Sequence, residues 1–275
     1  TAANVNLIPE PGTLALLASL LLLACGPSLI PNTQIPDTPE HREILQLVER
    51  YRQAMESRDF YFLSNNTSKN PDAYVRKLAA MGIPTERERV LSPVTPLVHH
   101  LRATGQRRIY PVGNEFFLTF LQELLPDVQY GEEDCQAVVL AYDTTLTYEK
   151  LARSALLLQR PEVAFYATHP DLVCPSPEGP LPDVGSFLAL YHTATGRRPD
   201  RIFGKPDPDM LAPLLGRYPR EAMVIAGDRL STDKKLAEAA GIDFILVLSG
   251  EARQEDLAGL DRQPSLILPD LGALL

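Results

Sequence analysis

The stretch MVIAGDRLSTDKKLAEAAGIDFILVLSGE, residues 223–251, decides the fold class of this chain. It opens with a short apolar run, Met223–Ala226, which predicts a buried strand. A polar turn leads from that strand into a helical pattern at Thr232–Ala240, and Phe244–Leu248 is a second apolar strand. A strand, a helix and another strand in this order predict a βα unit of a parallel sheet.

The same alternation of elements extends upstream. Apolar runs predict further strands at 60–63, 109–112, 137–141, 163–167 and 202–203. Apolar stripes with a helical period predict helices at 43–55, 71–81, 94–103, 115–125, 148–158, 184–194 and 209–215. We therefore expect an α/β protein with a parallel sheet.

The composition of the 275 residues is that of a globular protein, with 45% apolar and 22% charged residues. The length fits one large or two modest domains, and burial of this much apolar surface excludes disorder as the main state. The net charge of −9 argues against a nucleic-acid-binding protein, which needs a basic surface. Adjacent histidines on a helix point to different faces, so we expect His99 and His100 to be solvated. The cysteines are too widely spaced for a metal knuckle or a disulfide framework, at Cys25, Cys135 and Cys174.

The first forty residues follow a different pattern. The apolar run Leu14–Cys25 is too short to cross a membrane, which takes about 20 residues. It has the length of a signal-peptide core and ends like a lipid-attachment site at Cys25, but the basic segment that a signal peptide needs is missing. Ile8–Leu14 resembles a PEP-type sorting signal, which normally lies at a C-terminus. A buried strand or helix is the interpretation that we favour.

Polar residues follow three of the predicted strands, and ligands of open α/β sheets bind beyond the carboxyl ends of the strands. The first group is Ser64, Asn65 and Asn66. Their hydroxyl, amides and backbone N–H groups can bind phosphate oxygens. An Asx turn that caps the strand is the structural alternative for the same residues.

The second group is the turn GKPDP, Gly204–Pro208. Gly204 lets the backbone approach its neighbours closely, and the prolines stiffen the turn. Lys205 is the basic residue of this turn, and a point cation on a stiff support suits a phosphate or the anion that develops during its transfer. A solvated surface lysine is the alternative.

The third group is the turn Gly227–Asp233, with Asp228 directly after a strand and Asp233 five residues later. Two carboxylates at one strand end make an oxygen site suited to Mg²⁺. The alternative is helix capping by Ser231 or Thr232, with Asp233 placed favourably on the helix dipole.

In their order and spacing, these stretches resemble the haloacid dehalogenase-like (HAD) hydrolases of class IIA, the NagD-like or p-nitrophenylphosphatase-like group. The resemblance covers about Phe60 to the C-terminus. Its matching stretches are FYFLSNNTSKNPDAYVRKLAAMGI, VVLAYDTTLTYEKL, FYATHPDLVCP, TGRRPDRIFGKPDPDML and the stretch from residue 223 to 251.

The resemblance implies a Rossmann-like core of residues 1–105 and 200–275, with an α/β cap inserted at 106–199. It also implies a Mg²⁺-dependent phosphatase and gives the three polar groups their roles. Ser64 becomes the phosphate-binding hydroxyl, with Asn65 and Asn66 beside it, and Lys205 the lysine of the third family motif.

For the metal, the resemblance implies Asp228 as the more direct Mg²⁺ ligand, with Asp233 as its acidic partner. In the cap, His169 and Asp171 become candidates for substrate contact. The family usually has Asn at the position of His169.

The family's chemistry also needs a strand that ends in Asp-x-Asp-Gly-Thr. The first Asp attacks the phosphoryl group and the second acts as general acid and base. Upstream of Ser64 the aspartates are Asp37 and Asp59, and no Asp-x-Asp occurs there. Counting back through the first helix puts Cys25 at about the nucleophile's position, but a thiol is a poor Mg²⁺ ligand.

Three hypotheses follow. The first is a phosphatase of a small phosphorylated metabolite whose N-terminus is misrepresented here, for example by a frameshift; the absence of an initiator Met and of any basic residue before Arg42 favours it. The second is an impaired pseudophosphatase that binds phospho-ligands, and the third is an envelope protein lipidated at Cys25. We expect a cytoplasmic protein without membrane or nucleic-acid partners, and homodimer formation stays open.

Overall fold

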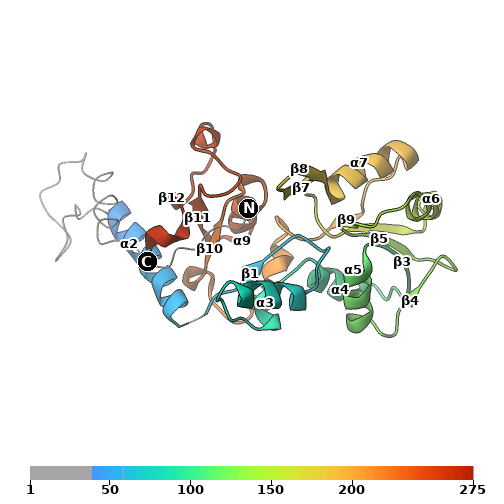
Figure 1. Cartoon of the computed structure of the whole chain (residues 1–275), viewed down its shortest axis with the longest axis horizontal. Coiled ribbons are helices and arrows are strands. Elements are labelled where there is room, and N and C mark those ends of the chain that lie inside the picture. The colour runs from blue at the N-terminus through green and yellow to red at the C-terminus, as the bar shows by residue number, and fades with distance from the viewer. Residues whose placement is uncertain (1–38, 58, 275) are drawn as a thin grey trace, which may run out of the picture. The chain divides into compact units, whose positions relative to one another are not determined.

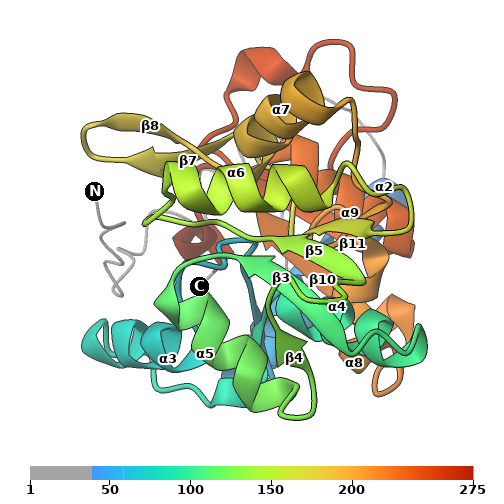
Figure 2. The same ribbon diagram turned by 90° about the vertical axis from the view of Figure 1, so that its right-hand side faces the viewer.

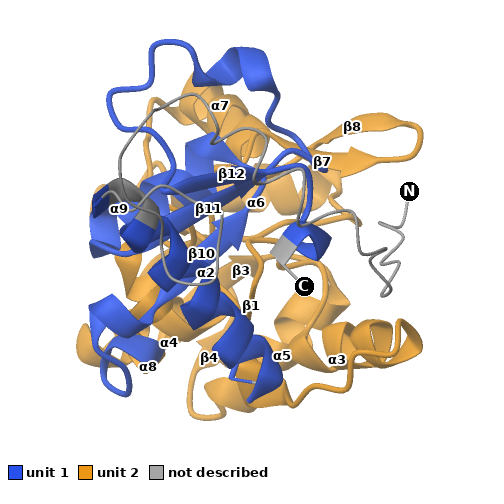
Figure 3. Cartoon of the chain, turned by 90° about the vertical axis from the view of Figure 1, so that its left-hand side faces the viewer, with its two compact units in different colours: residues 1–60, 214–275 blue, residues 61–213 orange. Residues whose placement is uncertain are grey.

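A computed structural model describes residues 39–57 and 59–274. The early apolar run and Cys25, the position expected for the nucleophile, lie outside these residues. The chain divides into two compact units (Figure 3). Unit 1 contains residues 214–275 and the segment that ends at residue 60, and unit 2 is residues 61–213.

A five-stranded parallel sheet is the centre of unit 2 (Figures 1 and 2). Its strand order is β4-β3-β5-β6-β9. The chain adds β4 on one side of β3 and then β5, β6 and β9 in turn on the other side. The strands are β3 (Arg108–Val112), β4 (Gln129–Tyr130), β5 (Ala137–Leu140), β6 (Ala164–Ala167) and β9 (Arg201–Ile202).

Helices cover both faces of this sheet, because successive side chains of β5 point to opposite faces and are apolar on both. Val138 and Leu140 face one core cluster, whereas Ala137 and Val139 face the other. Figure 2 shows α6 across one face and α5 on the opposite one. The first face is covered by α6 (Tyr148–Leu157) and α7 (Val184–Thr195), and the second by α4 (Val94–Ala103) and α5 (Glu115–Leu124).

Two smaller sheets complete unit 2. Parallel strands β1 (Phe62–Leu63) and β2 (Val90–Leu91) are joined through α3 (Pro71–Ala80), and η1 (Arg87–Arg89) precedes β2. The antiparallel pair is β7 (Val173–Ser176) and β8 (Gly179–Pro182). The unit ends in η2 (Pro208–Leu211) and the start of α8 (Ala212–Leu215).

Unit 1 is a three-stranded parallel sheet between two helices. Leu47 and Tyr51 of α2 pack against Ile245 and Leu268 on one face, and α9 packs on the other. The elements are α2 (Pro39–Glu56), η3 (Arg220–Ala222), β10 (Val224–Gly227), the π-helical turn η4 (Leu230–Lys234), α9 (Lys235–Ala240), β11 (Asp243–Val247), η5 (Gln254–Leu257), β12 (Leu266–Leu268) and η6 (Leu271–Leu274).

The parallel sheets confirm the predicted α/β fold, and most predicted elements appear within one or two residues. The β7–β8 hairpin was not predicted, because Pro175, Pro180 and Pro182 argue against strands. A two-stranded ribbon accommodates them, since each strand pairs on one side only. Within residues 39–57 and 59–274, no helix has the length and apolar character to cross a bilayer.

Candidate functional site

Ser64 follows the last residue of β1 and is fixed at this strand end. Its backbone N–H donates to the carbonyl of Leu91, at the end of β2, over 3.1 Å. Its hydroxyl lies 2.9 Å from the Tyr74 hydroxyl and accepts the N–H of Asn66 at 3.3 Å. Burial raises the pKa of Tyr74, so the phenol keeps its proton at neutral pH. Ser64 therefore has a defined position before any ligand arrives.

Asn66 forms the Asx turn that was the structural alternative for this loop. Its Oδ1 accepts both the N–H of Ser68 at 2.9 Å and the Ser68 hydroxyl at 2.7 Å. Its Nδ2 lies 3.8 Å from the Sγ of Cys174. The Asn66 side chain shapes the loop, and its backbone N–H points to Ser64.

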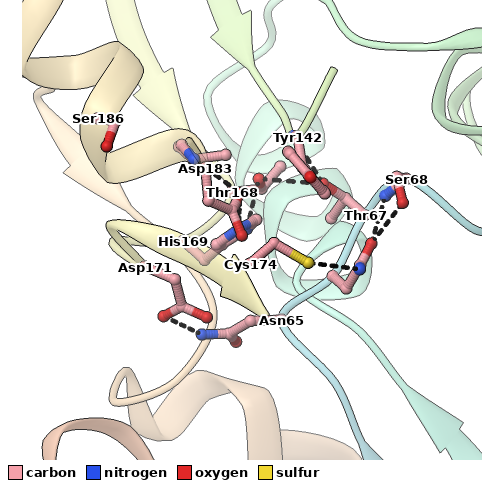
Figure 4. A network of polar contacts seen from close by, with 12 residues as sticks. Asn65, Thr67, Ser68, Tyr142, Thr168, His169, Asp171, Cys174, Asp183 and Ser186 are labelled. Carbon is pink, nitrogen blue, oxygen red and sulfur yellow. Dashed lines mark hydrogen bonds and ion pairs between the residues drawn. The ribbon is translucent and has the colours of Figure 1, made fainter. Parts of the chain in front are cut away.

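Asn65 joins the Ser64 loop to the Lys205 turn. Its Oδ1 accepts the N–H of Lys205 at 2.8 Å, and its Nδ2 donates to the Lys205 carbonyl at 3.0 Å. The same Nδ2 donates to Oδ1 of Asp171 at 3.1 Å (Figure 4). The side chain is buried, and both of its N–H groups are engaged by protein oxygens. This differs from the expectation that Asn65 binds phosphate, since its amide clamps the backbone of Lys205 instead.

Gly204 makes this clamp sterically possible. Its φ is +80°, a backbone conformation that side chains disfavour. A Cβ at this position would lie 2.6 Å from the Thr168 carbonyl and 2.8 Å from Oδ1 of Asn65. The predicted close approach of the Gly204 backbone is confirmed.

The Lys205 ammonium reaches the end of β1. Its Nζ lies 3.4 Å from the carbonyl of Leu63, the residue directly before Ser64, although 142 positions separate lysine and leucine in the sequence. Lys205 is half-buried. Unit 2 therefore brings the Lys205 ammonium to the strand end that Ser64 follows.

His169 is the centre of a buried polar network (Figure 4). Its Nε2 lies 2.9 Å from Oδ1 of Asp183, and its Nδ1 lies 3.0 Å from the Thr168 hydroxyl. The same Asp183 oxygen accepts the N–H of Val184 at the start of α7. His169 has no exposed surface, so it cannot touch a substrate in this structure. The expectation of substrate contact is corrected to an internal role that ties the end of β6 to α7.

Asp171 lies beside this pair. Its carboxylate, the Asp183 carboxylate and a ring nitrogen of His169 all lie within 4.8 Å of one another, close enough to hold a metal ion. His169 and Asp183 are already bonded to each other, and Asp171 is bonded to Asn65. This set is also different from the aspartates that the sequence analysis assigned to Mg²⁺.

Those aspartates lie in unit 1, on the turn after β10. Oδ2 of Asp228 accepts the N–H of Glu251 at 2.8 Å, and Oδ2 of Asp233 accepts the N–H of Arg229 at 3.2 Å. An ion pair of 2.8 Å joins the side chains of Arg229 and Glu251 across the two loops. Neither Ser231 nor Thr232 caps the helix, but Asp233 lies in its first turn, as the capping alternative expected.

Two glycines allow these carboxylates to lie against the backbone. A Cβ on Gly227 would meet the Asp233 carboxylate at 2.4 Å, and one on Gly250 would meet the Asp228 carboxylate at 2.0 Å. Asp233 is buried, as is Thr232, whose hydroxyl has no hydrogen-bond partner. The turn therefore holds two positioned carboxylates and one unsatisfied hydroxyl.

Comparison with known proteins shows the family of this chain. The model described as haloacid dehalogenase-like hydrolase matches residues 38–124, and the model described as HAD-hydrolase-like matches 202–274. The solved 4-nitrophenylphosphatase of Thermotoga maritima is 37% identical, with a TM-score of 0.74 over 86% of this chain and 89% of that one. This chain belongs to the haloacid dehalogenase-like hydrolases.

Two other relatives of this HAD hydrolase are named phosphatases. The acid sugar phosphatase of Staphylococcus haemolyticus is 28% identical over 218 residues, which are 78% of this chain and 81% of that protein. The glycerol phosphate phosphatase of Mycobacterium tuberculosis, solved with magnesium, is 29% identical with a TM-score of 0.70, over 78% of this chain and 66% of that one. The chain is a HAD phosphatase of class IIA, as the sequence predicted.

The sequence analysis did not include Cys174 and Tyr142 among the residues of this HAD site. Cys174 on β7 approaches Asn66, and it interacts with Tyr142. Burial is the larger cause and Cys174 the second, and together they raise the pKa of Tyr142 to about 12. The phenol is therefore neutral. Tyr142 lies just beyond the end of β5, so the strand-end rule could have found it. For Cys174, a single cysteine among prolines, no sequence pattern indicated a place in the site.

Proposed function

We propose that this HAD hydrolase is a Mg²⁺-dependent phosphatase of a small phosphorylated metabolite. The observation that carries the proposal is the contact of the Lys205 ammonium with the carbonyl of Leu63, the residue directly before Ser64. The name acid sugar phosphatase of a relative supports a small phosphorylated substrate. We also propose residues 106–199 as the cap and 1–105 with 200–275 as the core; four strands of the five-stranded sheet lie inside the cap range.

In this proposal, unit 2 recognises the phosphate. The Ser64 hydroxyl and backbone N–H groups of its loop donate to phosphoryl oxygens, while the Lys205 ammonium neutralises their charge. Asn65 and Gly204 hold Lys205 in place through the backbone. Asn66 acts through the loop that its side chain shapes. Preorganised donors of this kind need little rearrangement when charge develops on the phosphoryl group.

Unit 1 holds the metal in this proposal, and its donor set fits Mg²⁺. Asp228 and Asp233 supply the hard oxygen ligands that this ion prefers. Because Gly227 and Gly250 have no Cβ, the two carboxylates can pack against their backbone. The buried, unpartnered Thr232 hydroxyl could bond to a water of the ion's shell. When bound, Mg²⁺ would supply the Lewis-acid chemistry that phosphoryl transfer uses.

A binding experiment tests the phosphate residues. Lys205→Ala should weaken binding of inorganic phosphate or vanadate at least tenfold, about 1.4 kcal/mol, because it removes the cation at the strand end. Lys77→Ala is the matched control, since Lys77 is an exposed lysine of the same unit. Isothermal titration of both variants measures the difference. Equal phosphate affinities of the two variants would show that Lys205 is an ordinary surface lysine.

A thermal experiment tests the metal residues. Mg²⁺ should raise the melting temperature of the wild-type chain by mass action, and Asp228→Asn should abolish the rise. Asp261→Asn, which changes an exposed aspartate of the same unit, should keep it. A Mg²⁺ response that survives Asp228→Asn would overturn the assignment. A panel of phosphomonoesters, assayed with Mg²⁺ and with a chelator, then identifies the substrate.

A further inference from the structure

We infer that Arg201 is a positioning residue for Lys205, and that His100 makes this positioning sensitive to acid. The inference rests on the proposed function, because it concerns the turn that presents Lys205 to phosphate. Neither residue is among those assigned above, and both belong to unit 2.

Arg201 holds the outer side of the Lys205 turn. Its Nη2 bonds to the carboxylates of Asp207 and Asp209, and its guanidinium lies 4.7 Å from the centroid of the Phe203 ring. Asp207 closes the turn, because its N–H donates to the Gly204 carbonyl at 2.7 Å. Its Oδ1 accepts the N–H of Asp209 at 3.0 Å.

The Lys205 turn is therefore held from both sides. Asn65 bonds the backbone of Lys205 from the inner side, and Arg201 holds Asp207 from the outer side. Loss of the guanidinium would leave the Asp207 and Asp209 carboxylates facing each other without a cation. The turn between Gly204 and Asp207 would then lose its outer support, and the Lys205 ammonium its fixed position.

His100 contacts the same guanidinium. Its Nδ1 lies 3.4 Å from Nη1 of Arg201, and Arg201 is always a donor, so Nδ1 must accept and the ring must be neutral. The ring packs edge-on against Tyr166 at 5.0 Å and against Phe203 at 5.4 Å. The expectation that both adjacent histidines are solvated is therefore wrong for His100, which these rings half-bury.

His100 and Arg201 line a cavity of about 270 Å³, through which solvent protons can reach the ring. The charged and titratable groups around it are Arg201 from β9, Asp209 from η2, Tyr166 from β6 and the neighbouring His99. Burial, and then the Arg201 charge, lower the pKa of His100 below its ordinary value. A proton on Nδ1 removes the acceptor and sets two cations against each other. Acid should therefore loosen Arg201, and with it the turn.

Sulfate binding tests the inference, because sulfate mimics phosphate and keeps its charge from pH 5 to 8. At pH 7.5, Arg201→Met should weaken sulfate binding at least fivefold, and Arg201→Lys should recover part of the loss. Wild-type affinity should fall between pH 7 and pH 5.5. His100→Gln, which keeps a neutral acceptor at every pH, should flatten that profile.

Arg197→Met is the matched control. The Arg197 guanidinium also anchors unit 2, through the carbonyls of Leu158, Arg160 and Val163, so this variant should lose stability and keep sulfate affinity. If Arg201→Met fails to fold, Asp209→Asn replaces it and should weaken binding about twofold.

Sulfate affinity that survives both Arg201→Met and Asp209→Asn overturns the inference, as does a pH profile unchanged by His100→Gln. The proposed function has its own criterion, the Lys205→Ala variant. Sulfate binding that Lys205→Ala leaves unchanged, or absent binding in the wild type, overturns the proposed function and the inference with it.

Discussion

At the scale of single residues, Gly250 decides whether Asp228 can keep its position. A methyl group there would lie 2.0 Å from Oδ2 of Asp228, so the carboxylate must turn away and lose the N–H of Glu251. We expect Gly250→Ala to destabilise the protein by about 1–3 kcal/mol and to abolish the Mg²⁺-induced rise in melting temperature. Gly131→Ala is the control, because an added Cβ there meets nothing within 4 Å. Calorimetry with and without Mg²⁺ measures both effects; an intact Mg²⁺ response in Gly250→Ala would contradict this.

Titration of His100 gives a second expectation at this scale, for stability. The folded state lowers the pKa of His100, so between the folded value and the ordinary value of about 6.5 the unfolded chain binds more protons. Stability then rises with pH through that window and falls as the pH drops through it. Melting temperatures should therefore fall less between pH 7 and pH 5.5 in His100→Gln than in the wild type. An equal fall in melting temperature for the two proteins would contradict this expectation.

At the scale of elements, the strands determine which thiols can react. Cys135 is buried just before β5, where burial raises the pKa of its thiol and its Sγ contacts the Ala137 carbonyl. Cys174 lies half-exposed on β7. Because the thiolate is the nucleophile, iodoacetamide should label Cys174 at least tenfold faster than Cys135 in the native protein. Peptide mass spectrometry separates the two sites, denatured protein is the control, and equal native rates would contradict the structure.

The elements also explain what the sequence could predict. Helix α4 was predicted at its observed bounds, because its apolar stripe is a local pattern. Ser64 and Lys205 were chosen as candidates because each follows a predicted strand, although β1 and β9 belong to different sheets. The clamp between Asn65 and Lys205 was missed, because it joins residues 140 positions apart. His100 was assigned to solvent for the same reason, since it is covered by Tyr166 of β6 and by Phe203, which follows β9.

At the scale of the whole molecule, the two units differ in continuity. Unit 2 is one unbroken segment with its own sheet and helices on both faces, so residues 61–213 should fold alone with a cooperative melt. Residues 214–275 lack the helix α2 that covers Ile245 and Leu268, so they should stay unfolded alone. Circular dichroism of the two fragments tests this, and adding a peptide of residues 39–60 to the second fragment should restore structure. Independent folding of 214–275 would show that α2 is dispensable.

The same discontinuity sets an order of events on the ribosome. Helix α2 emerges first, yet the strands that bury its Leu47 and Tyr51 are translated only after the whole of unit 2. At roughly 5–20 residues per second, that delay is about ten to forty seconds. For this time the apolar stripe of α2 is open to chaperones and proteases while unit 2 can already fold. Pulse proteolysis of nascent chains stalled before β10 should cut within residues 39–60 and spare unit 2.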